Sequence, residues 1–343
     1  MSPNLRPSRR HAACVAIAAA GFLLTMSALA PTYAKGQLVK IPLSIDAATV
    51  STGSAVLLDA AALAKGKLVV DSNVPITVQQ RVTAEDPSGS DVVTLQSAVQ
   101  MVRDDRVGSA AIVNASIDRS TVDRISAMPV EEPIGSIQTV MDKPAEVVAH
   151  EGLQFKFPFD TQKRTYPYFD STLRDSYDAN FIAEGEVEGV DVYNFRQEIA
   201  PVAIGTEITL PASSWGKPGT IPVTMKRFYG ITRELSVEPI SGAIIQVQQH
   251  YRQYFATSAS APETITIIDV APKLDSQTQH EQIERAVMYR DQIRWGTDYG
   301  PAIGGSVGLL LLLGGIYLGW TSTRPGPQSL IVQNGKSGDL VAL

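Results

Sequence analysis

The chain has 343 residues, a formal net charge of −6 and 44% apolar residues, which suits one large folded domain or two ordinary ones. Its basic residues are scattered among acids, so it lacks a stripe that neutralises phosphates, and no nucleic acid partner is expected. The single cysteine, Cys14, excludes an internal disulfide and a cysteine-built zinc site. The four histidines are dispersed, so we expect no metal and no cofactor.

The first predicted element is an apolar helix near the start of the chain. Three arginines within the first ten residues precede an uncharged stretch over residues 12–30, a pattern typical of an export signal and of an uncleaved signal anchor. Cleavage after residues 28–30 is disfavoured by the proline that follows, whereas residues 32–34 form an acceptable site. The anchor is the favoured interpretation and a cleaved signal the alternative. We therefore predict that residues 1–34 form a basic cytoplasmic start and a first transmembrane helix.

Residues 35–276 are predicted to form a β-rich domain outside the cytoplasm. Short runs of valine, isoleucine, threonine and aromatic residues alternate there with glycine and proline clusters. A charged, proline-containing stretch ends near His150, so we expect one subdomain over residues 35–149 and another over residues 150–276. The alternative is that both halves share one continuous sheet.

Several strands can be placed within this domain. Large apolar residues alternate over residues 153–159, which predicts an extended segment with one apolar face. Residues 178–199 have the pattern of a hairpin that turns at Glu188-Gly189. A strand is expected over residues 223–229, and a turn at residues 237–242 should lead into a strand that ends near Phe255.

Helices are predicted at three places between the two ends. Residues 97–104 and 55–65 have the composition of short helices. Apolar residues recur near helical spacing over residues 277–295, amid many charges, so residues 277–300 are expected to form a membrane-proximal helix. Glycine and proline at residues 296–301 predict a break after it.

A second transmembrane helix is predicted over residues 301–320. The run from Ala302 to Trp320 is uncharged and about as long as the roughly 20 residues that a helix needs to span a bilayer. Residues 321–343 would then form a flexible cytoplasmic tail. Two small-residue motifs allow close approach of another helix, either a second copy of this span or the first span. Their residues are Gly304, Gly308, Gly315 and Gly319.

Four motifs carry a resemblance to a known family: residues 156–159 (KFPF), 165–170 (TYPYFD), 185–195 (GEVEGVDVYNF) and 237–242 (VEPISG). In this order, between two apolar runs, they resemble an actinobacterial envelope family of unknown function that is often labelled porin PorA. Polar growth factor A, implicated in mycolate-type lipid traffic at growing poles, is similar to this family. The resemblance implies a related role for this chain.

The favoured function is a membrane-anchored envelope protein that binds or relays lipid, or that serves as a scaffold for envelope-lipid transport and cell-wall growth. It would lie in the plasma membrane with its main domain on the periplasmic side. Expected partners are membrane lipids, envelope-lipid transporters or other membrane proteins, and a second copy paired through the transmembrane helices. A lipid carrier needs an apolar concavity, for which aromatic strand residues are candidates, although ordinary core packing explains them as well. These candidates are Phe155, Phe157, Phe159, Tyr166, Tyr168 and Phe169.

The alternative functions are an oligomeric pore and an enzyme. An oligomeric, porin-like pore would need many spans, because two apolar helices enclose no conduit. An enzyme would need a catalytic constellation. Four aspartates cluster around Arg164 and Arg174, namely Asp160, Asp170, Asp175 and Asp178. Such clusters are commonly solvated loop charges, so no catalytic residue is expected. The fold class expected is a mainly β (α+β) ectodomain between N- and C-terminal transmembrane helices.

Overall fold

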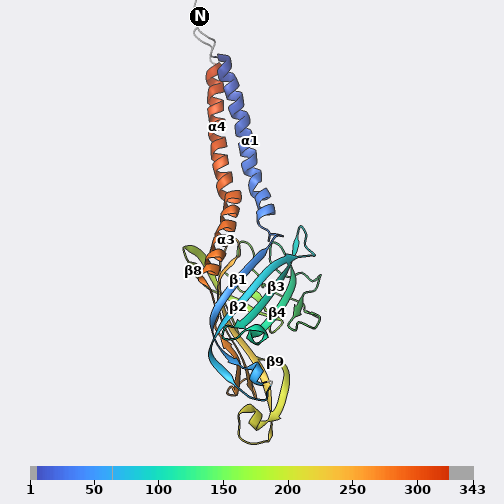
Figure 1. Ribbon diagram of the computed structural model, residues 1–343. Helices are drawn as coiled ribbons and strands as arrows, with labels where there is room; N and C mark the ends of the chain where they lie inside the picture. The colour runs from blue at the N-terminus through green and yellow to red at the C-terminus, as the bar shows by residue number, and fades with distance from the viewer. Residues whose placement is uncertain (1–5, 64, 324–343) are drawn as a thin grey trace, which may run out of the picture. The chain divides into compact units, whose positions relative to one another are not determined.

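In the computed structural model, which describes residues 6–63 and 65–323, the chain forms two compact units (Figure 1). The unit Gly36–Ile293 is mostly β-sheet, and the other, from the described residues of Met1–Lys35 and Arg294–Leu343, is helical. This confirms the expected mainly β fold with an apolar helix near each end. Most of the tail expected over residues 321–343 lies outside the described residues, which end at Thr323.

One antiparallel sheet of thirteen strands forms most of the Gly36–Ile293 unit. Its strands make two meanders, which join where β1 pairs with β12. The first meander contains β1 (Asp46–Leu58), β2 (Val70–Glu85), β3 (Val92–Arg103), β4 (Ile112–Asp123), β5 (Ser136–Gln138) and β6 (Glu146–Val147). The second contains β7 (Tyr166–Asp170), β8 (Asp175–Val187), β9 (Val190–Pro211), β10 (Pro222–Val237), β11 (Ile244–Ala256) and β12 (Ile265–Val270). The short β13 (Lys273–Leu274) pairs with both β1 and β11.

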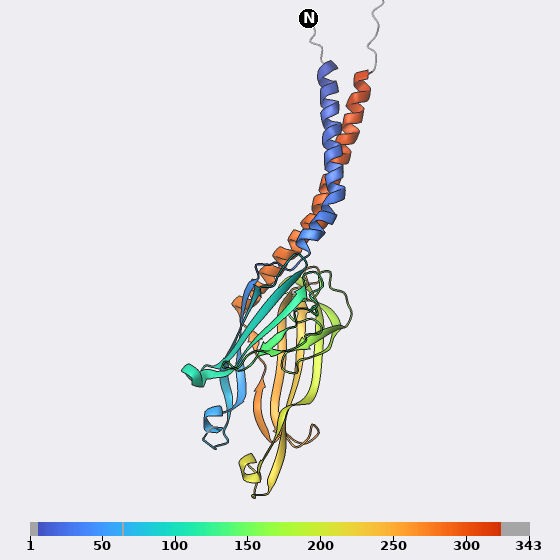
Figure 2. The same ribbon diagram turned by 90° about the vertical axis from the view of Figure 1, so that its right-hand side faces the viewer.

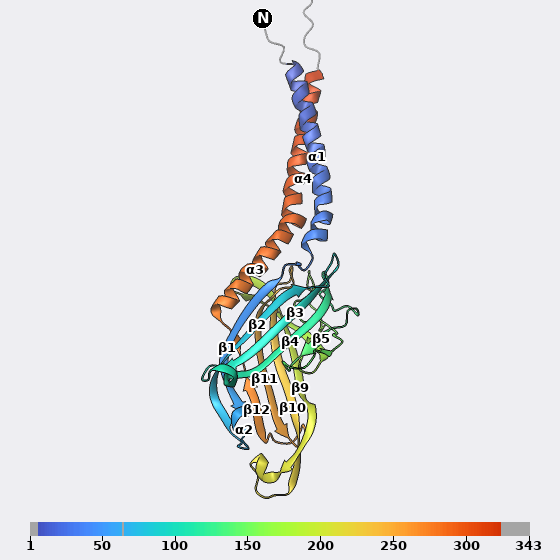
Figure 3. The same cartoon turned by 45° about the vertical axis from the view of Figure 1, so that its right-hand side comes forward.

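The sheet curls so that its two meanders face each other. Figures 1 to 3 show β1–β4 as one layer and β9–β12 as a second layer that crosses it. Alternation along β9 separates the two faces: Phe195 and Ile199 are buried, whereas Arg196 and Glu198 are exposed. The main core cluster joins both meanders, because it contains Leu95 of β3 together with side chains of β9 and β10.

Aromatic side chains fill this core where the meanders meet. The ring of Phe157 lies 4.5 Å from that of Phe195 and 5.3 Å from that of Tyr166, measured between centroids. Phe181 meets Phe195 edge to face, and the hydroxyl of Tyr168 donates a hydrogen bond to the carbonyl of Gln154. Aromatic pairs in such geometries stabilise a core beyond the area they bury.

An irregular segment between β6 and β7 joins the outer edges of the two meanders. The backbone of Leu153 exchanges two hydrogen bonds with β7, while Val148 N–H donates to the carbonyl of Gly135, just before β5. His150 Nε2 lies 2.8 Å from a carboxylate oxygen of Asp118 in β4, and Gln154 donates to the other oxygen. The segment therefore fastens the edge of one meander to the edge of the other.

Helices and tight turns occupy the remainder of this unit. The short helix α2 (Ala60–Leu63) and the two 3-10 turns, η1 (Gly108–Ala111) and η2 (Ala212–Trp215), lie in connections between strands. The longer α3 (Ser276–Arg294) is capped at its N-terminus by Asp275, whose carboxylate accepts a hydrogen bond from Thr278 N–H. Ile283 and Ala286 of α3 pack on side chains of β9 and β11. A helix over residues 277–295 was predicted, and the structure confirms it.

The two short helices predicted from composition are wrong. Residues 97–103 belong to β3, which forms full ladders with both β2 and β4. Ala55 and Leu57 lie in β1 with their side chains in the core, and the helix that follows is only Ala60–Leu63. Pairing with two neighbours and burial of alternate residues outweigh weak helix propensity in both places.

Two further predictions need correction. Residues 153–159 do not form a regular strand, because Phe157 N–H bonds the carbonyl of Gly242 in the β10–β11 turn instead of a ladder partner. The break expected at residues 296–301 is a π-helical turn, η3 (Trp295–Tyr299), that runs into α4 (Gly300–Thr323). Pro301 follows this turn within a continuous helical stretch, and a π-helical turn is one way in which a helix accommodates the hydrogen bond that a proline cannot make.

The predicted hairpin and turns of the second half are confirmed. β8 and β9 meet at Glu188-Gly189, β10 contains residues 223–229, and the turn after Val237 leads into β11. Gly242 has a φ of +72°, and a Cβ there would lie 2.1 Å from the carbonyl oxygen of Phe157. The halves on either side of residue 150 contribute to one sheet, which was the alternative to two subdomains.

We predict that Phe157→Ala lowers the free energy of unfolding by about 3–5 kcal/mol, since it removes a fully buried ring that touches three others. The loss of β-sheet circular dichroism with denaturant measures the change. Ile182→Ala, at a half-exposed position of β8, is the control and should cost well under half as much. Equal losses in the two variants would show that the aromatic cluster is not the main source of stability.

Candidate functional site

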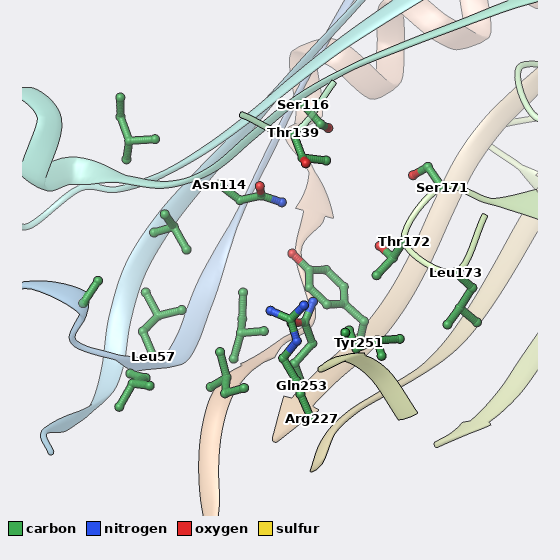
Figure 4. Close-up of a pocket in the computed structure, with 18 of the residues that line it drawn as sticks. Leu57, Asn114, Ser116, Thr139, Ser171, Thr172, Leu173, Arg227, Tyr251 and Gln253 are labelled. Carbon is green, nitrogen blue, oxygen red and sulfur yellow. The ribbon is translucent and has the colours of Figure 1, made fainter. Parts of the chain in front are cut away.

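A cavity of about 1240 Å³ lies between the two meanders of the sheet (Figure 4). Strands from both meanders line it, together with the turn between β7 and β8. Its apolar wall includes Leu57, Val113, Ile204 and Ile268. Ligand pockets in proteins typically measure about 300–1,000 Å³, so this cavity has room for a large molecule.

The cavity is open to solvent. Ile112 and Val202 contribute to its lining, yet they are 43% and 37% exposed. Other lining residues, among them Leu57 and Ile268, are buried in a second core cluster formed by β1, β2, β3 and β12. The cavity is therefore a recess with a deep apolar wall and an accessible entrance.

Polar side chains are placed at intervals over this apolar surface. Figure 4 shows Asn114, Tyr251, Gln253 and Arg227 directed into the space, with Asn114 facing the group from the opposite meander. The hydroxyl of Tyr251 lies 3.8 Å from the sulfur of Met101, and burial raises the pKa of this tyrosine. Tyr251 therefore remains a neutral hydroxyl at physiological pH. A wall of this composition suits a ligand with both apolar and polar parts.

An ion-pair network stands at one side of the cavity. Arg103 binds carboxylates of Asp71 and Asp105, and Arg106 forms two hydrogen bonds with the carboxylate of Asp59. The hydrogen bond from Arg106 holds the pKa of Asp59 far below its ordinary value. These arginines are thus committed to protein carboxylates and fix the β1–α2 connection against β3.

The six aromatic residues expected to line a lipid site lie elsewhere. Phe157, Tyr166 and Tyr168 belong to the main core cluster, with Phe155 and Phe159 packed against it. Phe169 packs with Ile137 and Val148 in a separate cluster. Among the described residues that line the cavity, none of the six occurs. Their large rings fill the interior where the meanders meet, and the hollow begins where the inward side chains are smaller.

Sequence reasoning missed the polar cavity residues because they resemble ordinary strand residues. Arg227 and Gln253 each occupy an inward position between two apolar residues of the same strand. From the sequence alone, a single arginine or glutamine in an alternating strand does not show whether its side chain faces the interior or the solvent. Only the pairing of β10 with β9 and β11 shows that Arg227 lies on the inner face of the sheet.

The predicted acidic cluster is dispersed by the fold. Asp170 is buried and accepts a hydrogen bond from the hydroxyl of Tyr229 at 3.0 Å, with Arg233 beside it at 3.3 Å. Arg174 pairs instead with Glu146 of β6. Asp170 is therefore a structural anion of the interior rather than a solvated loop charge.

The side-chain amine of Lys156 is buried next to the aromatic core. Its nitrogen lies 3.5 Å from the centroid of the Phe159 ring and, within the described part of the chain, has no hydrogen-bond partner. Burial lowers the pKa of Lys156 to about 7, against a smaller opposing effect of Glu238. A neutral amine is consistent with such an environment.

The two apolar helices, α1 (Arg6–Leu38) and α4, pack together through small residues within the helical unit. Positions 13, 20, 27 and 34 of α1 hold alanine or serine at heptad spacing. A Cβ at Gly304 would lie 2.6 Å from Ser27 Oγ, and one at Gly315 would lie 2.8 Å from a methylene carbon of Ile17. Gly308 has similarly close neighbours in Leu23 and Leu24.

These contacts place three of the four predicted interface glycines against α1. Gly319 differs, because its added Cβ would meet no described heavy atom within 4 Å. The expected partner of these motifs was either a second copy of this span or the first span, and the structure shows the first span, α1. Glycine at such positions allows two helices to approach closely, which is how helices associate in lipid.

The outer surface of the helix pair is apolar. Val15, Phe22, Leu310 and Leu313 are each more than half exposed. Both helices are long and apolar enough to cross a membrane, and the 24 residues of α4 span about 36 Å, against about 30 Å for the hydrocarbon core. Side chains of this kind would be unfavourable in water over so large an area.

Comparison with known proteins gives a family. The model of the family described as Porin PorA matches residues 12–317. A porin PorA of Corynebacterium amycolatum is 26% identical over 84% of this chain and 93% of its own length. Another from Corynebacterium resistens is 24% identical over 76% of this chain and 84% of its own length. The chain belongs to the Porin PorA family, and together with the two apolar helices this indicates a membrane-associated protein.

We predict that stability depends on pH through Lys156. Its pKa is about 7 in the folded chain and about 10.4 in an unfolded one, so between these values the unfolded chain binds more protons. Stability should therefore rise with pH across this window. Lys156→Met should flatten the rise and raise the melting temperature most near and below pH 7. Lys67→Met, at an exposed position, is the control, and an unchanged slope in Lys156→Met would contradict the account.

We also predict that Gly315→Leu separates α1 from α4, whereas Gly314→Leu does not. A side chain at residue 315 collides with α1, but a Cβ at residue 314 has no described atom within 4 Å. Spin labels on Cys14 and on a cysteine replacing Ile316 report the distance between the helices by electron paramagnetic resonance. The distance should lengthen only in Gly315→Leu. The same distance in both variants would show that the glycine contact does not hold the pair.

Proposed function

We propose that this member of the Porin PorA family is a membrane-anchored protein whose sheet unit holds an amphiphilic ligand in the cavity between its meanders. The observation that supports it most is the cavity itself, a recess of about 1240 Å³ with a deep apolar wall and isolated polar groups. A lipid or another amphiphile combines these two chemistries in one molecule. The cavity takes the place of the aromatic strand face as the candidate lipid site.

The anchor consists of α1 and α4. Because α1 carries small residues at heptad spacing that fit the glycines of α4, its apolar stretch has a packing partner that a discarded signal would not need. This supports retention of the first helix. With two crossing helices, both ends of the chain lie on one side of the membrane and the sheet unit on the other. The arginines before the first span favour the cytoplasm for the ends, and on this ground we propose that the sheet unit faces the outer side of the plasma membrane.

A tethered ligand-binding domain of this kind would relay lipid between the membrane and the envelope, or present it to envelope-lipid transporters. Mycolate-type lipids are the class implied by the family resemblance. The tether keeps the cavity near the membrane in which its ligand is made or consumed.

A pore is the second candidate, because the family is described as a porin. The outer face of the sheet does not favour a lipid-facing wall: Arg196 and Glu198 are exposed, and Arg196 pairs there with Glu234. Membrane barrels instead present an apolar band to lipid. A conduit would therefore have to be built from several copies of the helix pair. Conductance steps of the full-length protein in a planar bilayer would support this function.

The cavity proposal predicts that Asn114→Trp removes bound amphiphile. Asn114 projects into the cavity and is exposed, so an indole there can fill the space without disturbing the core. Full-length protein purified from membranes is extracted with solvent, and its lipids are quantified by mass spectrometry. We expect bound amphiphile to fall about tenfold in Asn114→Trp. Ala115→Trp, at the next and outward-facing position, should retain the wild-type amount.

Unfolding curves of both variants check that the fold is intact. Wild-type protein that carries no lipid or other amphiphile, or variants that carry equal amounts, would overturn the cavity as the ligand site.

A further inference from the structure

We propose that the cavity selects an amphiphile with an acidic head, a carboxylate or a phosphate monoester, and that Arg227 binds this head. The inference rests on the proposed function, since it assumes that an amphiphile enters the cavity, and it adds the chemical class of the ligand. Four observations support it: the direction of the side chain, its lack of a carboxylate partner among the described residues, the space left by Gly205, and the apolar wall beside it.

The direction of Arg227 follows from its strand. In β10, residues 225, 227 and 229 share one face, and Met225 and Tyr229 are both buried in clusters that border the cavity. The guanidinium group therefore points to the interior of the curled sheet. Figure 4 shows it in the space between the meanders, and Gln253 and Tyr251 lie on the neighbouring strand β11.

Arg227 differs from the other arginines of the lining in its partners. Arg103, Arg106 and Arg174 each bind a carboxylate of the protein. Within residues 6–63 and 65–323, no carboxylate lies within 4.0 Å of the Arg227 guanidinium, and no hydrogen bond to it is formed. It is thus a cation held over an apolar wall with its five N–H donors available.

The neighbouring strand β9 leaves room for a ligand beside the guanidinium group of Arg227. Gly205 of β9 has a φ of +69° and lies at an irregularity of the pairing, where Arg227 aligns with Ile204. A Cβ at Gly205 would come within 3.3 Å of the guanidinium nitrogen Nη2. A larger residue would therefore crowd the cation, and glycine keeps one side of it open.

The surroundings fit an oxyanion attached to a chain. A guanidinium forms paired hydrogen bonds with carboxylate and phosphate oxygens, and these bonds are stronger where water is partly excluded. Tyr251 and Gln253 supply neutral donors on the neighbouring strand, while Leu57 and Ile268 offer apolar surface to a hydrocarbon chain. A small anion would use only the polar half of this site, whereas an acidic amphiphile would use both halves.

The test is binding of a fluorescent acid, dansyl-undecanoic acid, and of its methyl ester to full-length protein in amphipol. Wild-type protein should bind the acid at least tenfold more tightly than the ester. Arg227→Gln should weaken binding of the acid by about tenfold and leave that of the ester unchanged, and Arg227→Lys should retain part of the preference. Lys226→Gln, which removes a charge from the outer face of the same strand, should behave as wild type.

Competition for the bound probe distinguishes an acidic amphiphile from a small free anion. Dodecyl phosphate should displace the probe, and inorganic phosphate at the same concentration should not. Equal affinity of wild type for acid and ester, or full affinity of Arg227→Gln for the acid, would overturn the inference while leaving amphiphile binding intact. Displacement by inorganic phosphate alone would also overturn it, in favour of a small-anion site. Failure of both probes to bind would instead count against the proposed function itself.

Discussion

The pairing of β1 with β12 is the constraint on which the sheet unit depends. It joins two meanders that are each continuous in sequence, and the register Ala55↔Val270 sets which side chains face inward on both. Once the meanders are joined there, the curl of the sheet brings their inner faces together. The segment around His150 fastens the far edges through its contact with Asp118. The interior formed in this way is larger than the side chains that fill it.

The size of the inward side chains decides where the interior is packed and where it is hollow. Phe157, Tyr166 and Phe195 stack into a closed core. Farther along β9 the inward residues are aliphatic, such as Ile204, and a cavity remains between the meanders. Hydrophobic burial at the packed end stabilises the fold, so the open end is free to hold something else. The packed core and the cavity thus occupy different parts of one sheet.

Local patterns revealed much of the fold but not the site. The hairpin at Glu188-Gly189, the long helix after Asp275 and the two apolar spans could be predicted, because turn chemistry, capping and hydropathy act over a few neighbouring residues. The strand identity of residues 97–103 could not, since it comes from pairing with β2 and β4. The cavity depends on contacts between β1 and β12, about 210 residues apart in sequence, which no local pattern encodes. For the same reason, the aromatic residues around Phe157 indicated where the core lies but not where the cavity lies.

Small residues fit α1 to α4, apolar side chains cover the outside of this pair, and the chain between them forms the sheet in which we propose that an amphiphile binds. The most direct test of this proposal is electron cryo-microscopy of the full-length protein purified from its own membranes. The account predicts elongated density that does not belong to the protein, lying between the meanders along Leu57 and Ile268. A sheet whose halves close on each other, with side chains filling this space, would contradict it.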